Sequence, residues 1–102
     1  MHYQFNDANA LAWRPSTFAE GIEVKDLGSS DGQSMQLVRF AAGASFPLHR
    51  HRGPEFIYLI EGAAVQEGQA LSAGWAAVAA TGTTDAYFHS PTGCVFLTVY
   101  SD

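Results

Sequence analysis

The chain has 102 residues, of which 47% are hydrophobic, and a formal net charge of −5 at pH 7. This length predicts a single domain over residues 1–102, with enough apolar side chains to form a core. The 5 Lys and Arg residues, against 10 Asp and Glu, provide no basic patch, which argues against nucleic-acid and membrane partners.

Cys94 is the single cysteine, so the sequence excludes an internal disulfide. The first seven residues lack the basic start and the apolar stretch of a secretion signal. Together these observations predict a cytoplasmic protein.

Two strands are predicted before Gly62. Residues 28–32 are rich in Gly and Ser and predict a turn, and residues 35–40 then predict a strand. Residues 56–60 give the strongest strand signal, because they are all β-branched, aromatic or leucine. Glu61 and Gly62 are expected to end this strand.

The second half continues in the same way. A weaker strand is predicted at residues 63–65, a turn at 66–69, and further strands at 75–79 and 94–100. No segment shows the sustained 3.6-residue periodicity of an amphipathic helix. Short strands separated by turns at intervals of about 8–12 residues are typical of an all-β sandwich or barrel.

Two histidines and a glutamate form the most informative cluster. In an extended chain, His49 and His51 point to the same face, and Glu55 has the same parity after the turn-prone Gly53 and Pro54. Two imidazoles and one carboxylate suit Fe, Mn, Ni or Zn. The alternative is that both histidines are solvated loop residues.

The spacing of this cluster matches a longer pattern. Gly43 is followed by five residues, His49, one residue, His51, three residues, Glu55, six residues and Gly62. This pattern resembles the first motif of the cupin superfamily. The resemblance implies a small single-domain cupin, which is a double-stranded β-helix or jelly-roll barrel, holding one divalent metal ion.

Several other segments are similar to the ChrR-like cupin group: residues 13–15, 37–39, 44–49, 53–55, 59–62 and 93–94. That group includes the C-terminal domain of zinc-binding anti-sigma factors. It is related to small dioxygenases that act on acetylacetone and 2,4'-dihydroxyacetophenone. The resemblance implies a metal-dependent dioxygenase acting on a small organic substrate, and a homodimer.

The second cupin motif departs from the family pattern. Gly74 and Gly82 match, but Ala80 stands in place of a proline and Asp85 in place of the expected fourth histidine ligand. His89 is the other nearby histidine, and an extended chain would place it about 13 Å from Asp85. The fourth ligand is therefore Asp85 or His89, or the site is an open triad completed by water.

Three aromatic residues, Tyr58, Trp75 and Tyr87, are predicted to line the pocket at the barrel mouth, with ordinary core packing as the alternative. Three functions follow from the whole pattern. The first is a metal-dependent oxygenase, and the second is a non-catalytic metal-binding or sensor domain. The third is a degenerate, metal-free cupin that binds a small molecule.

Overall fold

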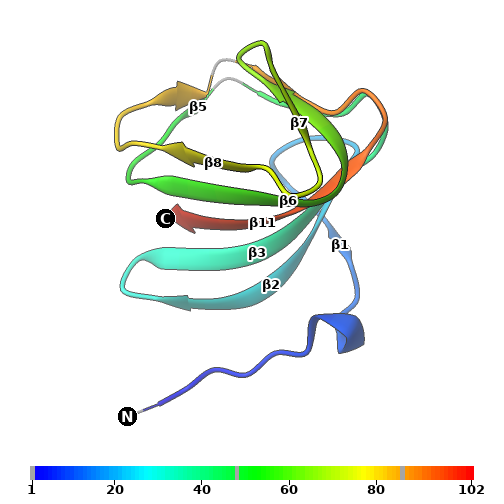
Figure 1. Ribbon diagram of the computed structural model, residues 1–102. Helices are drawn as coiled ribbons and strands as arrows, with labels where there is room; N and C mark the ends of the chain where they lie inside the picture. The colour runs from blue at the N-terminus through cyan, green and yellow to red at the C-terminus, as the bar shows by residue number, and fades with distance from the viewer. Residues whose placement is uncertain (1, 48, 86) are drawn as a thin grey trace.

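The computed structural model describes residues 2–47, 49–85 and 87–102, with the side chain of Asp85 outside the description. It is almost entirely β, and one large antiparallel sheet curls around the interior (Figure 1). This sheet has 9 strands and a second sheet has 2. Among the described residues, no helix has the length and apolar character that a membrane crossing requires.

The elements follow one another with short connections: η1 (Ala8–Ala10), β1 (Arg14–Pro15), β2 (Ile22–Ser30), β3 (Gln33–Phe40), β4 (Ser45–Phe46), β5 (His49–Arg50), β6 (Glu55–Gln66), β7 (Gln69–Ser72), β8 (Ala76–Ala79), β9 (Thr84–Asp85), β10 (Phe88–His89) and β11 (Cys94–Ser101). The main sheet runs in the order β1-β2-β3-β11-β6-β10-β4, and β7 and β8 also pair with β6. The small sheet joins β5 to β9. The all-β prediction is confirmed.

Two tight hairpins organise the sheet. Asp31 and Gly32 connect β2 to β3 with φ angles of 54° and 78°, and Glu67 and Gly68 connect β6 to β7 with 49° and 81°. Positive φ at both central residues is the geometry of a two-residue type I′ hairpin. The turn predicted over residues 28–32 is therefore too wide, because residues 28–30 belong to β2, which bulges between Asp26 and Gly28.

Strand β6 is longer than the sequence predicted. It continues through Gly62, where a strand end was expected, and takes in the weaker predicted segment at residues 63–65. Gly62 has φ +82°, a left-handed conformation that glycine adopts without steric cost. The glycine bends one strand instead of ending it, so the first part of β6 pairs with β8 and the second with β7.

The core lies on the inner face of the curled sheet. Four phenylalanine rings pack edge to face or tilted, with Phe40, Phe88 and Phe96 fully buried and Phe46 partly buried. Cys94 is buried with them, and burial raises the pKa of its thiol. As predicted, this cysteine is an apolar core residue. A buried, protonated thiol is also a poor nucleophile.

A polar network on β1, β2 and β3 predicts how stability changes with acid. Hydrogen bonds from Gln36 and Arg14 hold the pKa of Asp26 below its ordinary value of 3.8. Because the folded state depresses this pKa, the stabilisation is present above pH 3.8 and is lost as pH falls through the folded value.

In Asp26→Asn, we expect the free energy of unfolding at neutral pH to fall by no more than about 1 kcal/mol, because the pair is solvent-exposed. The difference in unfolding free energy between wild type and Asp26→Asn should shrink below pH 3.8. Urea titrations at a series of pH values measure this difference. A difference that persists unchanged in acid would contradict this assignment.

Candidate metal centre

Three potential metal ligands meet at one end of the curled sheet. His49 lies on β5, His51 follows it, and Glu55 is the first residue of β6. The loop between them turns back, and backbone hydrogen bonds join His51 to Thr83 and Gly82. One ligand atom from each of the three residues lies within 4.8 Å of the others. The convergence predicted from spacing is therefore present in the fold.

His51 is the most deeply buried member of this triad, with a side chain that is 8% exposed. Its Nε2 lies against Glu55 Oε2. Neither ring nitrogen has a hydrogen-bond partner within the described structure. Buried polar atoms are almost always partnered, because leaving them unsatisfied costs free energy. A cation held between His51 Nε2 and the Glu55 carboxylate would satisfy that nitrogen, so the donor set fits a metal ion.

His49 is oriented by a backbone acceptor and by aromatic rings. Its Nδ1 lies 3.0 Å from the carbonyl oxygen of Pro47. Donation from Nδ1 to this oxygen leaves the lone pair on Nε2, which is how a ligating histidine is commonly fixed in one tautomer. Phe18 and Phe46 pack edge to face against the ring, with centroids at 5.2 and 5.9 Å. These contacts limit rotation of the imidazole.

Glu55 is held by a neighbouring strand. Thr98, buried on β11, donates from Oγ1 to Glu55 Oε1 over a long 3.5 Å. This hydrogen bond engages one carboxylate oxygen, while the other faces His51. Outer-shell partners of this kind orient a ligand and tune its affinity.

Removing this hydroxyl tests its role. In Thr98→Val, which keeps the side-chain shape, we expect metal affinity to fall about tenfold. Competition with a chromophoric chelator measures the affinity. Ser90→Ala is the matched control, because Ser90 is equally buried but donates to the Ala63 carbonyl oxygen at 2.5 Å. Equal affinity in wild type and Thr98→Val would show that the hydroxyl does not position Glu55.

Two cavities meet at the triad. The larger is about 340 Å³, and its lining includes His49, Glu55 and Thr98. The smaller is about 160 Å³, and its lining includes His51 and again Glu55. The lining of the larger cavity also includes apolar side chains, Phe18, Ile22, Val24, Val38 and Phe46, and the residues Arg14, Ser16, Thr17, Gln36 and Tyr100, which carry polar groups. A small organic molecule could enter it and reach the triad.

The two candidates for a fourth ligand differ in placement. Asp85 pairs in backbone register with His49, but its side chain lies outside the described structure. His89 does not join the described ligand cluster. Its strand neighbour Phe88 points into the core, so His89 points to the opposite face. There its ring packs on Tyr87, with centroids 4.6 Å apart.

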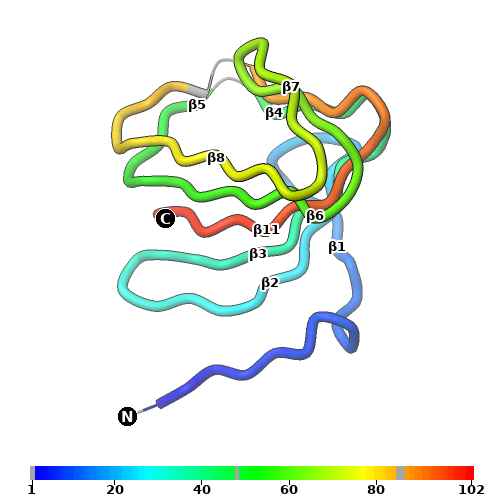
Figure 2. The backbone as a smooth tube through the Cα atoms, in the orientation of Figure 1, coloured from blue at the N-terminus to red at the C-terminus, as the bar shows by residue number. Residues whose placement is uncertain are grey.

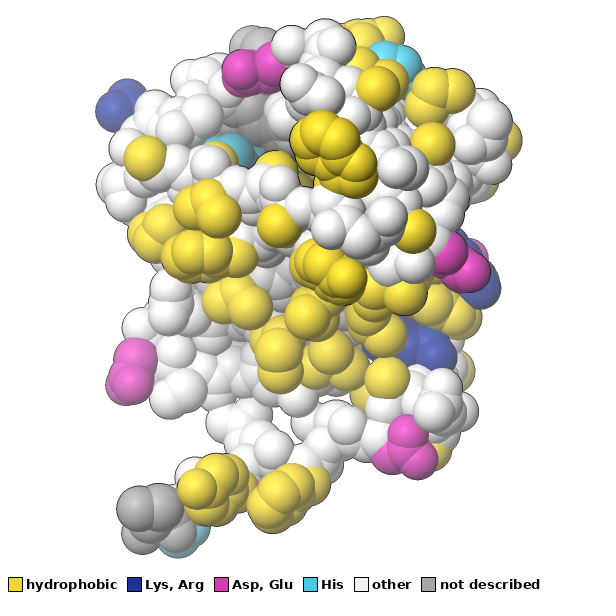
Figure 3. All heavy atoms as spheres, in the orientation of Figure 1, with side chains coloured by type: hydrophobic (Ala, Val, Ile, Leu, Met, Phe, Trp, Pro, Cys, Tyr) yellow, Lys and Arg dark blue, Asp and Glu magenta, His cyan; other side chains and the backbone are white. Residues whose placement is uncertain are grey.

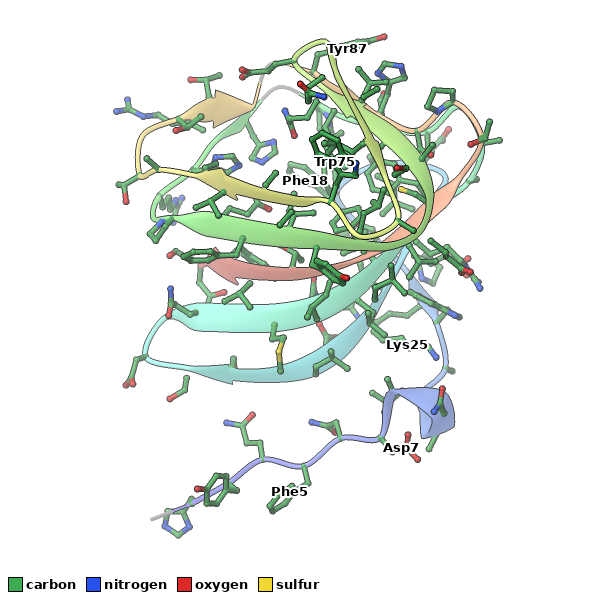
Figure 4. The ribbon with its side chains drawn as sticks, viewed as in Figure 1. Phe5, Asp7, Phe18, Lys25, Trp75 and Tyr87 are labelled. Carbon is green, nitrogen blue, oxygen red and sulfur yellow. The ribbon has the colours of Figure 1, made fainter. Side chains whose placement is uncertain are left out.

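The aromatic residues expected at the pocket lie elsewhere. Tyr58, Trp75 and Tyr87 do not line either cavity at the triad and are about half exposed. Tyr58 stands between the buried Ile57 and Leu59, so strand alternation directs it outward. Trp75 and Tyr87 likewise lie on the surface (Figure 4). These three side chains therefore lie outside the two cavities, and a part for them in binding a substrate stays a prediction.

Sequence reasoning missed Phe18, Pro47 and Thr98. Thr98 could have been found, because it shares parity with Phe96 on an apolar strand, and a buried threonine needs a partner. Phe18 gave no such signal, because it lies in the connection before β2 and reaches His49 only through the fold (Figure 4).

Known structures share this architecture. An acetylacetone dioxygenase from Acinetobacter johnsonii is 22% identical with a TM-score of 0.82, covering 99% of this chain and 74% of that one. A protein from Methylibium petroleiphilum PM1, described as a candidate acetylacetone dioxygenase, is 20% identical with a TM-score of 0.91, covering 99% and 78%. At this identity the likeness establishes the fold.

The anti-sigma protein ChrR of Rhodobacter sphaeroides, solved in complex with SigE, is 22% identical with a TM-score of 0.77. The alignment covers 93% of this chain but only 51% of ChrR. No curated protein matches the sequence. These likenesses and the curled sheet define a cupin fold.

The family follows from the sequence match. The model of the ChrR cupin-like domain matches residues 2–101. The chain therefore belongs to the ChrR cupin-like family, as its motifs predicted.

Proposed function

We propose that this protein is a metal-dependent enzyme of the dioxygenase type that acts on a small organic substrate. The observation that carries the proposal is His51, a buried imidazole without hydrogen-bond partners that faces Glu55 beside His49. One divalent ion, drawn from Fe, Zn, Ni and Mn, suits two nitrogen donors and one oxygen donor. When bound, such an ion supplies open positions for substrate and dioxygen.

The residues around the triad have separable roles in this proposal. His49 and His51 hold the ion, Glu55 adds a negative charge, and Thr98 orients that carboxylate. The apolar wall of the larger cavity, with Phe18 and Phe46 next to His49, excludes water and receives the substrate body. The fourth position belongs to Asp85, to His89 or to water. Because His89 lies outside the described ligand cluster, Asp85 and water are favoured.

A second candidate function is a non-catalytic metal-binding or sensor domain. Its support is membership of the ChrR cupin-like family and the similarity to ChrR, an anti-sigma protein. The larger cavity at the triad favours the enzyme, because a purely structural metal site needs no space for a substrate.

Two measurements test these functions in order. Elemental analysis of protein purified without chelators should find about one divalent ion per chain, and its absence would leave only a metal-free binding module. Oxygen consumption with Fe(II) and a panel of β-diketones and hydroxyaryl ketones should then show turnover. A metal-loaded protein inactive toward the whole panel would favour the sensor.

Three further predictions come from the sequence and the resemblance. We propose a single domain over residues 1–102, a cytoplasmic location and a homodimer. Fluorescence microscopy of a tagged chain tests the location. Light scattering on the full chain tests the homodimer. Cooperative unfolding, with coincident transitions by circular dichroism and tryptophan fluorescence, tests the single domain.

A further inference from the structure

A row of polar side chains crosses the inner face of the main sheet next to the triad. Thr98 pairs in register with Gln36 on β3, and Gln36 pairs with Asp26 on β2. Because Thr98 also donates to Glu55, the row begins beside the triad. Neighbouring strands are about 4.8 Å apart, so Asp26 lies about 10 Å from Thr98 along the sheet. The row therefore connects the triad to the β2 side of the sheet.

An ion pair forms the far end of this row. Nε and Nη2 of Arg14 donate to Asp26 Oδ2 at 2.9 and 2.7 Å, and Gln36 donates to Asp26 Oδ1 at 2.7 Å. Both carboxylate oxygens of Asp26 are thus engaged. Arg14 and Gln36 line the larger cavity, whereas Asp26 is not among its described lining residues. A molecule in this cavity would therefore meet Arg14 rather than the carboxylate that holds it.

The backbone also fixes Arg14 on the inner face. Arg14 belongs to β1, a two-residue strand at the edge of the sheet beside β2 (Figure 2). It pairs in register with the buried Val24, and partners in register share a face. The ring of the preceding Trp13 is covered by Lys25 and Arg39, at 4.8 and 4.4 Å from the ring centroid. These cation–π contacts hold the start of β1 against the sheet.

The Arg14 guanidinium has a second edge for a ligand. Its bonds to Asp26 leave from the edge formed by Nε and Nη2. The edge formed by Nη1 and Nη2 also has two N–H groups, and such a fork binds a carboxylate through two hydrogen bonds. The side chain of Arg14 is 51% exposed, so a ligand that enters the cavity can reach it.

The charges in the cavity favour an acid. At neutral pH, Arg14 and Glu55 are the only formally charged side chains in its described lining. When Glu55 shares a divalent ion with the histidines, Arg14 is the lining charge that remains for a ligand. The rest of the surface does not attract acids, because the chain has 5 Lys and Arg and a net charge of −5. Basic side chains are correspondingly few on the face drawn in Figure 3.

We propose that the larger cavity binds a small organic acid, with its carboxylate on Arg14 and its apolar body against Phe18 and Phe46. The other end of the molecule then lies at the triad. The cavity volume of about 340 Å³ is near the lower end of ligand sites, roughly 300–1,000 Å³, and suits a phenyl ring with a short chain. This inference rests on the proposed function, because it names the substrate class of the same site.

Two probes of equal shape test the proposal. 4-Phenylbutyrate has the carboxylate, and 4-phenylbutanamide replaces it with an uncharged amide. Calorimetry measures the dissociation constant of each probe for the full chain. The chain is used both as purified and after a chelator has removed its metal, because a carboxylate could also bind the ion directly.

In both states, 4-phenylbutyrate should bind to wild type at least about fivefold more tightly than to Arg14→Gln. The amide should bind to both proteins with the same affinity. Arg39→Gln is the matched control, because Arg39 also donates through Nε and Nη2 to a carboxylate, that of Glu23, but lines neither cavity at the triad. It should bind the acid like wild type. Circular dichroism confirms that each variant is folded.

Equal affinity of wild type and Arg14→Gln for the acid would overturn the proposal. So would an equal loss for acid and amide, because the substitution would then act on cavity shape and not on carboxylate recognition. Failure of wild type to bind the acid would overturn it as well. Bound metal should be equal in Arg14→Gln and wild type, so failure of the metal site and failure of this inference give different results.

Discussion

His51→Ala is expected to fold but to lose its metal, with the content falling from about one ion per chain to near zero. Losing an outer-shell partner of a ligand already costs about 10–100-fold in affinity, so losing a buried ligand costs at least about 100-fold. Elemental analysis after gel filtration measures the content. His49→Ala/His51→Ala should bind no metal at all.

Thermal unfolding provides an independent readout of the same variant. A ligand present at about 100 times its dissociation constant stabilises the folded state by about 2.7 kcal/mol. The wild-type midpoint should therefore rise on adding metal, and the His51→Ala midpoint should not. The metal-free proteins provide the baseline for this comparison, because the substitution also removes the contact of His51 Nε2 with Glu55 Oε2.

His89→Ala is the control for the site. It should retain a full complement of metal, because His89 lies outside the described ligand cluster. Loss of metal in His89→Ala would instead assign it as the fourth ligand. Retention of about one ion per chain in His51→Ala would show that the triad of His49, His51 and Glu55 is not the site.

Gly62→Ala is expected to destabilise the fold by at least about 3 kcal/mol, or to prevent soluble expression. A Cβ at this position would clash with the Gly93 carbonyl oxygen and lie 2.7 Å from Cys94 Cα. Both obstacles are backbone of the connection into β11, so they cannot rotate away. The positive φ of +82° adds strain for any residue with a side chain.

Gly43→Ala separates the clash from the strain. Gly43 has a similar φ of +85°, but a Cβ there would meet nothing within 4 Å. Its substitution should cost only about 1–2 kcal/mol, the price of a left-handed residue. Chemical denaturation of the two variants measures the difference. Equal losses would mean that close packing against β11 is not what requires a glycine at position 62.

The sequence predicted the all-β fold and the meeting of the triad because both depend on local patterns. Parity along an extended chain places His49, His51 and Glu55 on one side, and this parity survives in the fold. Thr98 could be recognised from strand parity as a buried polar residue. Its approach to Glu55, like that of Phe18 to His49, depends on long-range contacts that local patterns do not indicate.

The errors have a common physical origin. Residues 56–60 are apolar on both faces, so alternation could not indicate which face is inside, and the sequence did not show that Tyr58 points outward between the buried Ile57 and Leu59. Strand β2 was missed because its second half is polar and contains a bulge next to Gly28. Gly62 was interpreted as a strand end because glycine occurs both where a strand ends and where a continuous strand bends.

Glu55 forms part of the wall of both cavities at the triad. Any change in its length therefore alters two compartments together with the ligand set. Glu55→Asp shortens a side chain that lines both cavities, so a shift in its substrate preference would reflect altered cavity shape as much as an altered coordination sphere. Variants at Glu55 report on both cavities, whereas variants at His51 report on the cation and on the smaller cavity.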